Sequence, residues 1–330
     1  MMRVLVTGAS GFVGRHLVPA LVDGGHVVRA TCRPGRRAPL GTGAAEWTPL
    51  HDITSETEWA VAVRGVDAVV HLAGLAHQIG PGAETRESEF QRVNARGTER
   101  LAEASRRAGV RRVVMVSSIA VLGPYQGTPF TEASPCAPDT AYGRSKLEGE
   151  SAIRRLLAEG ETDWCILRPP LVYGPGNPGN MARLLRLIQR GLPLPLGRIE
   201  ASRSYIYVGN LTDLLVRCLT HPAASRRIFV VDDGEPVATQ TLIRLLAGYA
   251  GKAACLVPVW PWVLRALGRA GDHLQGLLGR SVGFDSYAID RLMGSLVIDS
   301  RAVQSALEWT PPYRQEAGLR STVQTALEAT

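Results

Sequence analysis

Tyr142 and Lys146 stand four residues apart, in a segment whose pattern predicts a helix over residues 142–159. Side chains at this spacing lie on one face of a helix. A tyrosine with a pKa near ~10 is a poor base at neutral pH, and an adjacent ammonium lowers that pKa because it stabilises the phenolate. Lowering it to roughly 7 requires about 4 kcal/mol of differential stabilisation. The pair therefore predicts acid/base chemistry at Tyr142.

Two hydroxyls, those of Ser117 and Ser118, follow the apolar run of residues 113–116, which predicts a buried strand. A hydroxyl beside Tyr142 can hold the oxygen of a carbonyl or an alcohol substrate. Serines in this position can also do no more than cap the strand. Their place between a glycine-rich turn and the tyrosine–lysine pair favours the chemical function.

Gly8, Gly11 and Gly14 follow a predicted strand at residues 3–6 and open a helix predicted over residues 14–23. This context is the one that a dinucleotide-binding turn requires. Gly8 permits a sharp turn, Gly11 lets the backbone approach a pyrophosphate at the helix N-terminus, and Gly14 lets the helix lie close to the sheet. The turn predicts a nicotinamide dinucleotide cofactor beside Tyr142.

The segment after the second predicted strand, residues 27–31, bears on which dinucleotide binds. Proteins that prefer NAD usually carry an acidic residue there, roughly 20 residues past the glycines. Residues 24–45 contain no Asp or Glu, and Arg33 stands just past the strand, with Arg36 and Arg37 close behind. This favours NADP(H), with Arg33 at the 2′-phosphate. The alternative is a solvated basic loop beside a permissive NAD(H) site.

Asp52 follows the third predicted strand, with Ile53 next to it. Its carboxylate can accept a hydrogen bond from the adenine amino group, or it can cap a helix N-terminus. Both interpretations stay open.

Strands predicted at residues 3–6, 27–31, 68–72, 113–116 and 165–167 alternate with helices predicted at residues 14–23, 90–108 and 142–159. Such alternation predicts an α/β fold with a Rossmann-type, doubly wound parallel sheet. Six prolines between residues 169 and 195 break the pattern. We therefore expect a dinucleotide-binding domain at residues 1–168, to which residues 204–231 return as strands at 204–208 and 228–231. Residues 169–330 are expected to form a smaller substrate-binding lobe.

The composition narrows the partners and the compartment. The net charge is +7, but no run of five Lys or Arg occurs, so nucleic acid is not expected. The five widely spaced cysteines include no CxxC pair and predict reduced thiols, with no metal site. With neither a signal peptide nor an 18-residue apolar run, we expect a cytoplasmic protein. The Trp-rich residues 256–268 allow a peripheral membrane helix, although a hydrophobic helix of the second lobe is favoured.

The chain resembles the extended short-chain dehydrogenase/reductase superfamily and, within it, the NAD-dependent epimerase/dehydratase family. The segments that carry the resemblance, in the family's order, are TGASGFVG at 7–14, VVHLAG at 69–74, VNARGT around Asn94, SSIAVLG at 117–123, YGRSK at 142–146, LRPPLVYGPG at 167–176 and RSYIYV at 203–208. Residues 256–269 and 291–303 are similar to bacterial UDP-4-keto-6-deoxy-N-acetylglucosamine 4-reductases, and the whole chain to UDP-glucose 4-epimerase-like proteins.

The resemblance implies that Tyr142 is the acid/base, that Lys146 binds the nicotinamide ribose, and that Ser118 is the catalytic hydroxyl. Ser118 and Tyr142 would also contact the substrate. Arg203 would hold the diphosphate of a sugar nucleotide, and Arg291 would offer a second phosphate contact. With the residues argued above, the expected cofactor-binding set is Gly8, Gly11, Phe12, Val13, Gly14, Arg33, Asp52, Ile53, Leu72, Ala73, Gly74, Asn94, Ser117, Tyr142, Lys146 and Pro170.

The resemblance, together with these residues, implies an oxidoreductase that acts at C4 of a UDP-sugar. The basic segment around Arg33 favours an NADP(H)-dependent 4-keto sugar-nucleotide reductase of surface-polysaccharide synthesis. The alternative is a UDP-hexose 4-epimerase with tightly bound NAD, and a non-catalytic dinucleotide sensor is a further one. The resemblance also implies a homodimer that pairs the helix at 142–159 with its twin through Leu147, Ile153, Leu156 and Leu157.

Overall fold

The computed structural model describes residues 1–34, 45–76, 86–278 and 286–328. Its centre is a seven-stranded parallel sheet in the order β10-β6-β5-β4-β1-β2-β3. This strand order is that of a Rossmann-type fold, so the predicted fold class is confirmed. The strands of this sheet are β1 (Arg3–Thr7), β2 (Val27–Cys32), β3 (Glu46–Pro49), β4 (Ala68–His71), β5 (Arg112–Val116), β6 (Asp163–Arg168) and β10 (Arg227–Val230).

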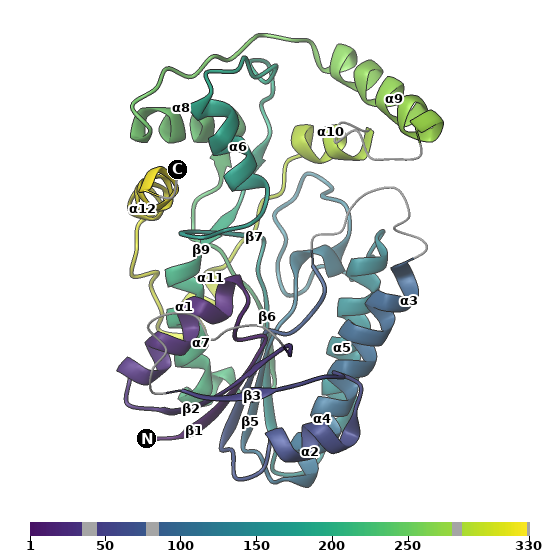
Figure 1. Cartoon of the computed structure of the whole chain (residues 1–330), viewed down its shortest axis with the longest axis vertical. Helices are drawn as coiled ribbons and strands as arrows, with labels where there is room; N and C mark the ends of the chain where they lie inside the picture. Colours follow the sequence, from purple (N-terminus) through teal and green to yellow (C-terminus); the bar gives the residue numbers. More distant parts are fainter. Residues whose placement is uncertain (35–44, 77–85, 279–285, 329–330) are drawn as a thin grey trace.

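Helices cover both faces of the sheet (Figure 1). One face carries α1 (Phe12–Asp23), α7 (Val208–Thr220) and α11 (Arg301–Leu307), and the other carries α2 (Glu56–Ala62), α4 (Gly97–Arg107) and α5 (Ala141–Leu156). The central strands are therefore apolar on both sides: in β5, Val114 packs with the first helix layer and Val113 and Met115 with the second.

A smaller lobe lies above the carboxyl ends of the strands (Figure 1). Two short sheets, one parallel and one antiparallel, stand at its base, and a separate apolar core fills it. Its strands are β7 (Leu171–Tyr173), β9 (Tyr205–Tyr207), β8 (Ser202–Arg203) and β11 (Val237–Ala238), and its helices are α6 (Asn180–Gln189), α8 (Thr239–Tyr249), α9 (Pro261–Leu278), α10 (Ser286–Met293) and α12 (Gln315–Glu328). The division of the chain after residue 168 remains our proposal.

The strand expected at residues 204–208 does not join the large sheet. Tyr205–Tyr207 pairs in parallel with β7, whereas β10 pairs with β6 at the sheet edge. The pattern of apolar residues was sufficient to indicate a strand. It could not identify the strand with which these residues pair. The partner, Leu171–Tyr173, becomes available only because the chain turns away from β6 at Pro169 and Pro170, and the pattern of apolar residues does not show this turn.

Two predicted helices have different bounds. The first begins at Phe12 rather than Gly14, since Gly11 is already the N-cap. The expected helix over residues 90–108 is divided into α3 (Glu87–Phe90), a π-helical segment η2 (Gln91–Arg96) and α4. Such π segments frequently mark functional sites. Here the segment carries Asn94, whose side chain bonds to Leu75 and Ser145.

A directed chain of hydrogen bonds crosses the sheet from the glycine turn to this π segment. Thr98 Oγ1 donates to the Asn94 carbonyl at 2.6 Å, so it accepts from His71 Nε2 at 3.0 Å. Thr7 Oγ1 accepts from two backbone amides and lies 2.7 Å from His71 Nδ1, to which it donates. His71 is thus neutral, and burial together with the Lys146 ammonium lowers its pKa to about 3.

This burial predicts a pH-dependent stability. Between pH ~3 and ~6.5 the unfolded chain protonates His71 and the folded chain does not, so the free energy of unfolding falls as pH decreases, by at most ~1.4 kcal/mol per pH unit. We expect denaturant titrations at pH 7.5 and pH 5 to show a smaller difference for His71→Gln than for the wild type. His51→Gln, at an exposed histidine, is the control and should keep the wild-type difference. Equal pH dependence in all three proteins would contradict the assignment.

Candidate active site

Tyr142 and Lys146 lie in the first turns of α5. The helix begins after Thr140, whose Oγ1 accepts from the Gly143 amide at 3.1 Å. Tyr142 is half-buried, and its ring meets Phe90 edge-on, with the ring centroids 6.0 Å apart. Ser145 Oγ donates to the Tyr142 carbonyl at 2.9 Å. The phenol is therefore positioned from both the helix and the neighbouring α3.

Lys146 is buried, and its Nζ donates to the Val116 carbonyl at 2.9 Å, at the end of β5. Burial lowers the pKa of this ammonium to about 8, against the opposing effect of Glu150 one turn further along α5. Lys146 still carries its charge at neutral pH. A cation held on the same helix face as Tyr142 is the arrangement that stabilises a phenolate.

Glu150 is itself tied to the sheet. Both of its carboxylate oxygens accept from Arg168 at the end of β6, from Nε at 3.0 Å and from Nη2 at 2.6 Å, and both side chains are buried. A bidentate pair of this kind fixes orientation as well as charge. Sequence reasoning missed this pair, although Glu150 stands four residues after Lys146, the spacing of a shared helix face.

Ser118 and Ser117 have different surroundings. Ser118 Oγ accepts from the Ala120 amide at 3.2 Å and caps a short 3-10 helix, η3 (Ile119–Leu122). The Ser117 hydroxyl is buried and has no hydrogen-bond partner within the described residues. The Ile119 amide donates to the Pro169 carbonyl, which brings the Pro169–Pro170 segment alongside. A buried hydroxyl without a partner fits a place where a cofactor would complete the hydrogen bonding.

The glycine turn is packed too closely for side chains. Gly8 has φ +66°, and a Cβ there would lie 2.8 Å from the Ala73 nitrogen. A Cβ at Gly14 would lie 2.5 Å from the Ala9 carbonyl oxygen. Helix α1 begins at Phe12 and Val13 with no side-chain cap on its first amides. These orphan amides fit the pyrophosphate that such a turn binds.

The loop after β4 joins the turn to the catalytic candidates. The amides of Leu72 and Ala73 donate to Thr7 Oγ1 at 3.2 and 3.1 Å. A Cβ at Gly74 would lie 3.0 Å from Asn94 Oδ1 and 3.5 Å from Lys146 Nζ. The structure thus brings the glycine turn, the β4 loop, Asn94 and Lys146 to one edge of the sheet.

Arg33 and Asp52 follow β2 and β3, the strands beside β1, where the adenosine of a dinucleotide is expected. Arg33 is exposed and directly follows β2, while Arg36 and Arg37 lie outside the described residues. Asp52 does not cap α2, because Ser55 does; Asp52 Oδ1 instead accepts from Thr54 and lies 3.3 Å from Arg92. These hydrogen bonds lower the pKa of Asp52. The helix-cap interpretation is therefore wrong, and the adenine contact remains a prediction.

Ile53 packs against the start of α4, where a Cβ at Gly97 would lie 3.0 Å from it. The two proposed phosphate arginines come from neighbouring segments of the second lobe. Arg203, on β8, donates to the Gly294 carbonyl at 2.6 Å. Arg291 lies in α10, three residues before Gly294, but its side chain lies outside the described part of the structure. Their contact with a diphosphate stays a prediction.

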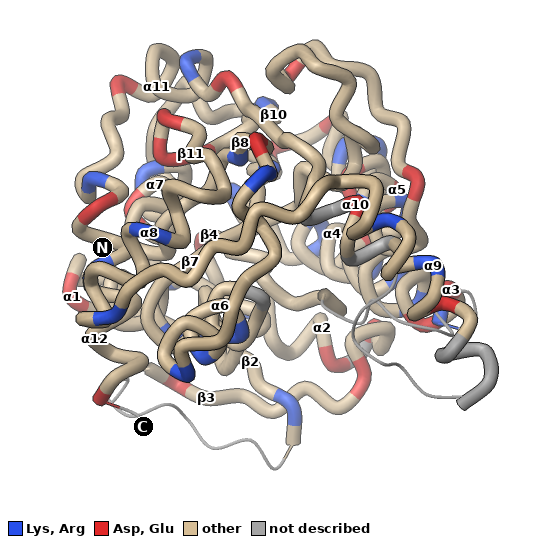
Figure 2. The backbone as a smooth tube through the Cα atoms, turned by 90° about the horizontal axis from the view of Figure 1, so that it is seen from above, with Lys and Arg blue, Asp and Glu red and all other residues tan. Residues whose placement is uncertain are grey.

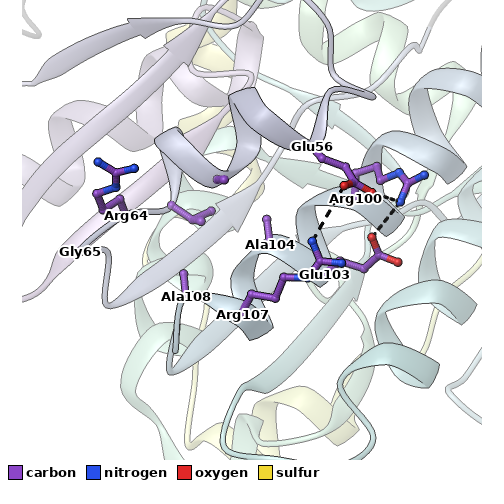
Figure 3. A pocket seen from close by; sticks show the side chains of 10 residues that line it. Glu56, Arg64, Gly65, Arg100, Glu103, Ala104, Arg107 and Ala108 are labelled. Atoms are coloured by element: carbon purple, nitrogen blue, oxygen red, sulfur yellow. Dashed lines mark hydrogen bonds and ion pairs between the residues drawn. The ribbon is translucent and has the colours of Figure 1, made fainter.

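The four apolar residues of α5 expected at a dimer contact differ in burial. Ile153 and Leu157 are fully buried in the core beneath α5, so they cannot meet a partner. On the neighbouring α2–α4 surface, a hollow of about 300 Å³ is lined by Arg100, which pairs with Glu56 and Glu103 (Figure 3). Leu147 and Leu156 are partly exposed, so the expected pairing of α5 with its twin could involve only these two of the four residues, and the homodimer stays a prediction.

The strand order, the glycine turn and the tyrosine–lysine pair define an extended short-chain dehydrogenase. Residues 4–232 match the model of the "NAD dependent epimerase/dehydratase family", and the chain belongs to that family. It is an enzyme of the epimerase/dehydratase type.

Similar proteins are known from curated sequences and from solved structures. The chain is 33% identical to a UDP-glucose 4-epimerase of Vibrio cholerae, over 99% of this chain and 96% of that protein. It is 27% identical to an N-acetyl-alpha-D-glucosaminyl-diphospho-ditrans,octacis-undecaprenol 4-epimerase of Escherichia coli O157:H7, over 98% and 94%. A solved structure, MoeE5 in complex with UDP-glucose and NAD, superposes with a TM-score of 0.78 at 28% identity and covers 99% of each chain.

The buried ammonium gives a direct test of the site's electrostatics. The chain contains only two lysines, Lys146 and the exposed Lys252, so lysine labelled with 13C at Cε yields two NMR signals. Lys146→Arg removes one signal and assigns both. We expect the Lys146 signal to titrate near pH 8, because burial disfavours the charged form. A midpoint at or above pH 10 would show that the ammonium is not desolvated.

Proposed function

We propose that this enzyme interconverts the configuration at C4 of a UDP-linked hexose, as a 4-epimerase that retains NAD(H). The observation that carries the proposal is the placement of Tyr142 and Lys146 on one face of α5, with the Lys146 ammonium bonded to the Val116 carbonyl at the end of β5, two residues before Ser118. The near full-length similarity to a UDP-glucose 4-epimerase, and the NAD and UDP-glucose in the MoeE5 complex, support it.

The chemistry follows from the residues. When bound, NAD supplies the hydride acceptor and donor. The Tyr142 phenolate takes the proton of the C4 hydroxyl as hydride leaves C4, and Ser118 holds the oxygen. Lys146 keeps the phenolate stabilised. Once the 4-keto sugar has rotated so that its other face would receive the hydride that the cofactor supplies, the Tyr142 phenol would return the proton to the C4 oxygen.

A second candidate is a 4-keto sugar-nucleotide reductase that uses NADPH. The specific observation in its favour is the exposed Arg33 at the end of β2, in a stretch without any acid. In this reaction hydride adds to the C4 carbonyl and the Tyr142 phenol protonates the oxygen. The same three residues serve both reactions, so cofactor exchange distinguishes them.

The substrates of related enzymes also differ in the group that the diphosphate joins to the sugar, which is either a nucleoside or a lipid. The Escherichia coli relative is named for a sugar carried on undecaprenyl diphosphate rather than on UDP. Exposed tryptophans at the start of α9 favour a lipid-linked sugar as the second substrate class. In either class Arg203 would hold the diphosphate.

Substitution of Tyr142 by Phe removes only the phenolic hydroxyl, so we expect the fold to persist and turnover of a UDP-hexose to fall by at least ~10²-fold. Turnover is measured by coupled detection of the C4 epimer, and folding by circular dichroism. Tyr249→Phe, on α8, is the matched control and should keep wild-type turnover. Near-normal activity in Tyr142→Phe would remove Tyr142 from the mechanism.

The cofactor separates the two candidates. For the epimerase, denaturing the purified protein should release about one NAD(H) per chain. For the reductase, the protein should be free of cofactor, and Arg33→Ala should weaken NADPH binding by roughly ten- to a hundredfold, the worth of one charge-assisted contact, with NADH unchanged. Arg154→Ala, an exposed arginine of α5, is the control. If Arg33→Ala changes neither cofactor, Arg33 belongs to a solvated loop, and the case for the reductase loses its support.

A further inference from the structure

The first half of α9 presents apolar side chains to the outside. Trp262 is 67% exposed and Leu267 is 48% exposed, and Trp260, just before the helix, is 55% exposed. At 100° per residue, positions 262, 263, 266, 267 and 270 of α9 form one continuous stripe, and four of the five side chains are exposed. We call this set, together with Trp260, the α9 stripe.

The orientation of the stripe is fixed by the opposite side of the helix. Leu264 and Gly268 are buried, and a Cβ at Gly268 would lie 2.9 Å from Ile289 and 3.0 Å from Ser286 of α10. The helix therefore packs on α10 through the Leu264 side. Rotating the apolar stripe inward would drive Trp262 into that close contact, so its exposure is built into the packing.

Basic side chains border the stripe. Arg265 and Arg269 are exposed along one edge of it, with Arg265 also 3.7 Å from Asp290. The Arg198 guanidinium lies over the Trp260 ring, 3.6 Å from its centroid. Lys252 is exposed on the segment that leads to the helix. Tryptophan and leucine beside arginine are the composition of helices that lie in the headgroup region of anionic membranes.

Helix α9 is also in the right place. It lies at the end of the molecule farthest from α2 (Figure 1) and at the rim when the molecule is seen from above (Figure 2). Nothing in the described fold covers its outer side. No helix of the described residues is long and apolar enough to cross a bilayer.

We propose that the α9 stripe docks this enzyme on the surface of a membrane that contains anionic phospholipids. Trp260, Trp262 and Leu267 enter the headgroup region, where an indole has apolar surroundings and a wet edge for its N–H. Arg265, Arg269 and Arg198 face the lipid phosphates. The second lobe then faces the bilayer, which would bring a lipid-linked sugar of the class proposed above within reach; the docking itself does not depend on which substrate is used.

Co-sedimentation with vesicles tests this. We expect the wild-type chain to bind vesicles of phosphatidylcholine that contain 30% phosphatidylglycerol. Binding to vesicles of phosphatidylcholine alone should be much weaker, because the arginines are attracted to the negative charge of the anionic surface. The double variant Trp262→Glu, Leu267→Glu should lower the partition coefficient for these vesicles at least ~tenfold, since the two substitutions place acidic side chains in the headgroup region. Val61→Glu is the matched control, because Val61 is 52% exposed on α2, at the end of the molecule opposite α9. This variant should bind the vesicles as the wild type does.

Turnover of a water-soluble UDP-hexose in the absence of vesicles is the second readout. The double variant should keep it, which separates loss of docking from loss of folding and from failure of the proposed reaction. Wild-type protein that ignores the anionic vesicles, or a double variant that binds them equally, overturns the proposal. So does light scattering that shows a wild-type dimer which the double variant converts to a monomer, because a second copy would then cover the stripe.

Discussion

Burying the Lys146 ammonium constrains everything packed around it. A cation in the interior loses its hydration, and this cost is offset only by groups fixed in the right places. The Val116 carbonyl and the Glu150 carboxylate meet that need from β5 and from α5 itself, and Arg168 holds Glu150 from β6. Removing Glu150 would leave Arg168 buried without its carboxylate, a change that typically costs ~3–5 kcal/mol. The position of Tyr142 is thus set by the charges behind it, through the helix that both residues share.

The buried Lys146 ammonium also affects the protonation of the neighbouring His71, which stays neutral. A second cation beside Lys146 would be repelled, and the depressed pKa of His71 shows that burial and the ammonium act together to keep the ring uncharged. Its fixed tautomer relays hydrogen bonds from Thr7 to Thr98 and so to the backbone of Asn94. Asn94 in turn bonds to Ser145, next to Lys146. The glycine turn and α5 are therefore joined by one path of hydrogen bonds, in which the ring of His71 is uncharged.

Sequence reasoning reached the parts of this arrangement that depend on local chemistry. The glycine turn could be predicted because only glycine fits its conformation and its close contacts, and the Tyr142–Lys146 pair because helix spacing puts both on one face. It failed where distant packing decides. The π segment carries Asn94, whose side-chain amide bonds across to Leu75 and Ser145, contacts that no periodicity shows. Ile153 and Leu157 were expected at a dimer contact but lie in the monomer core, because an apolar helix face alone does not say which of its residues meet the sheet. His71 belongs to the segment at residues 69–74 that carries the family resemblance, but its hydrogen bond to Thr7 can be foreseen only when β1 and β4 are known to be neighbours.

The free energy that separates an epimerase from a reductase lies away from the reacting atoms. The proposed roles of Tyr142, Lys146 and Ser118 would serve either reaction, since both would move a hydride at C4 and a proton at the same oxygen. An epimerase needs its cofactor to stay bound over many turnovers, whereas a reductase needs it to leave after each one. Every ~1.4 kcal/mol of binding changes that residence by about tenfold. An exposed contact between Arg33 and a 2′-phosphate would be of that size, so the side chain at the end of β2 would act on which dinucleotide binds and leave the acid/base chemistry at α5 unchanged.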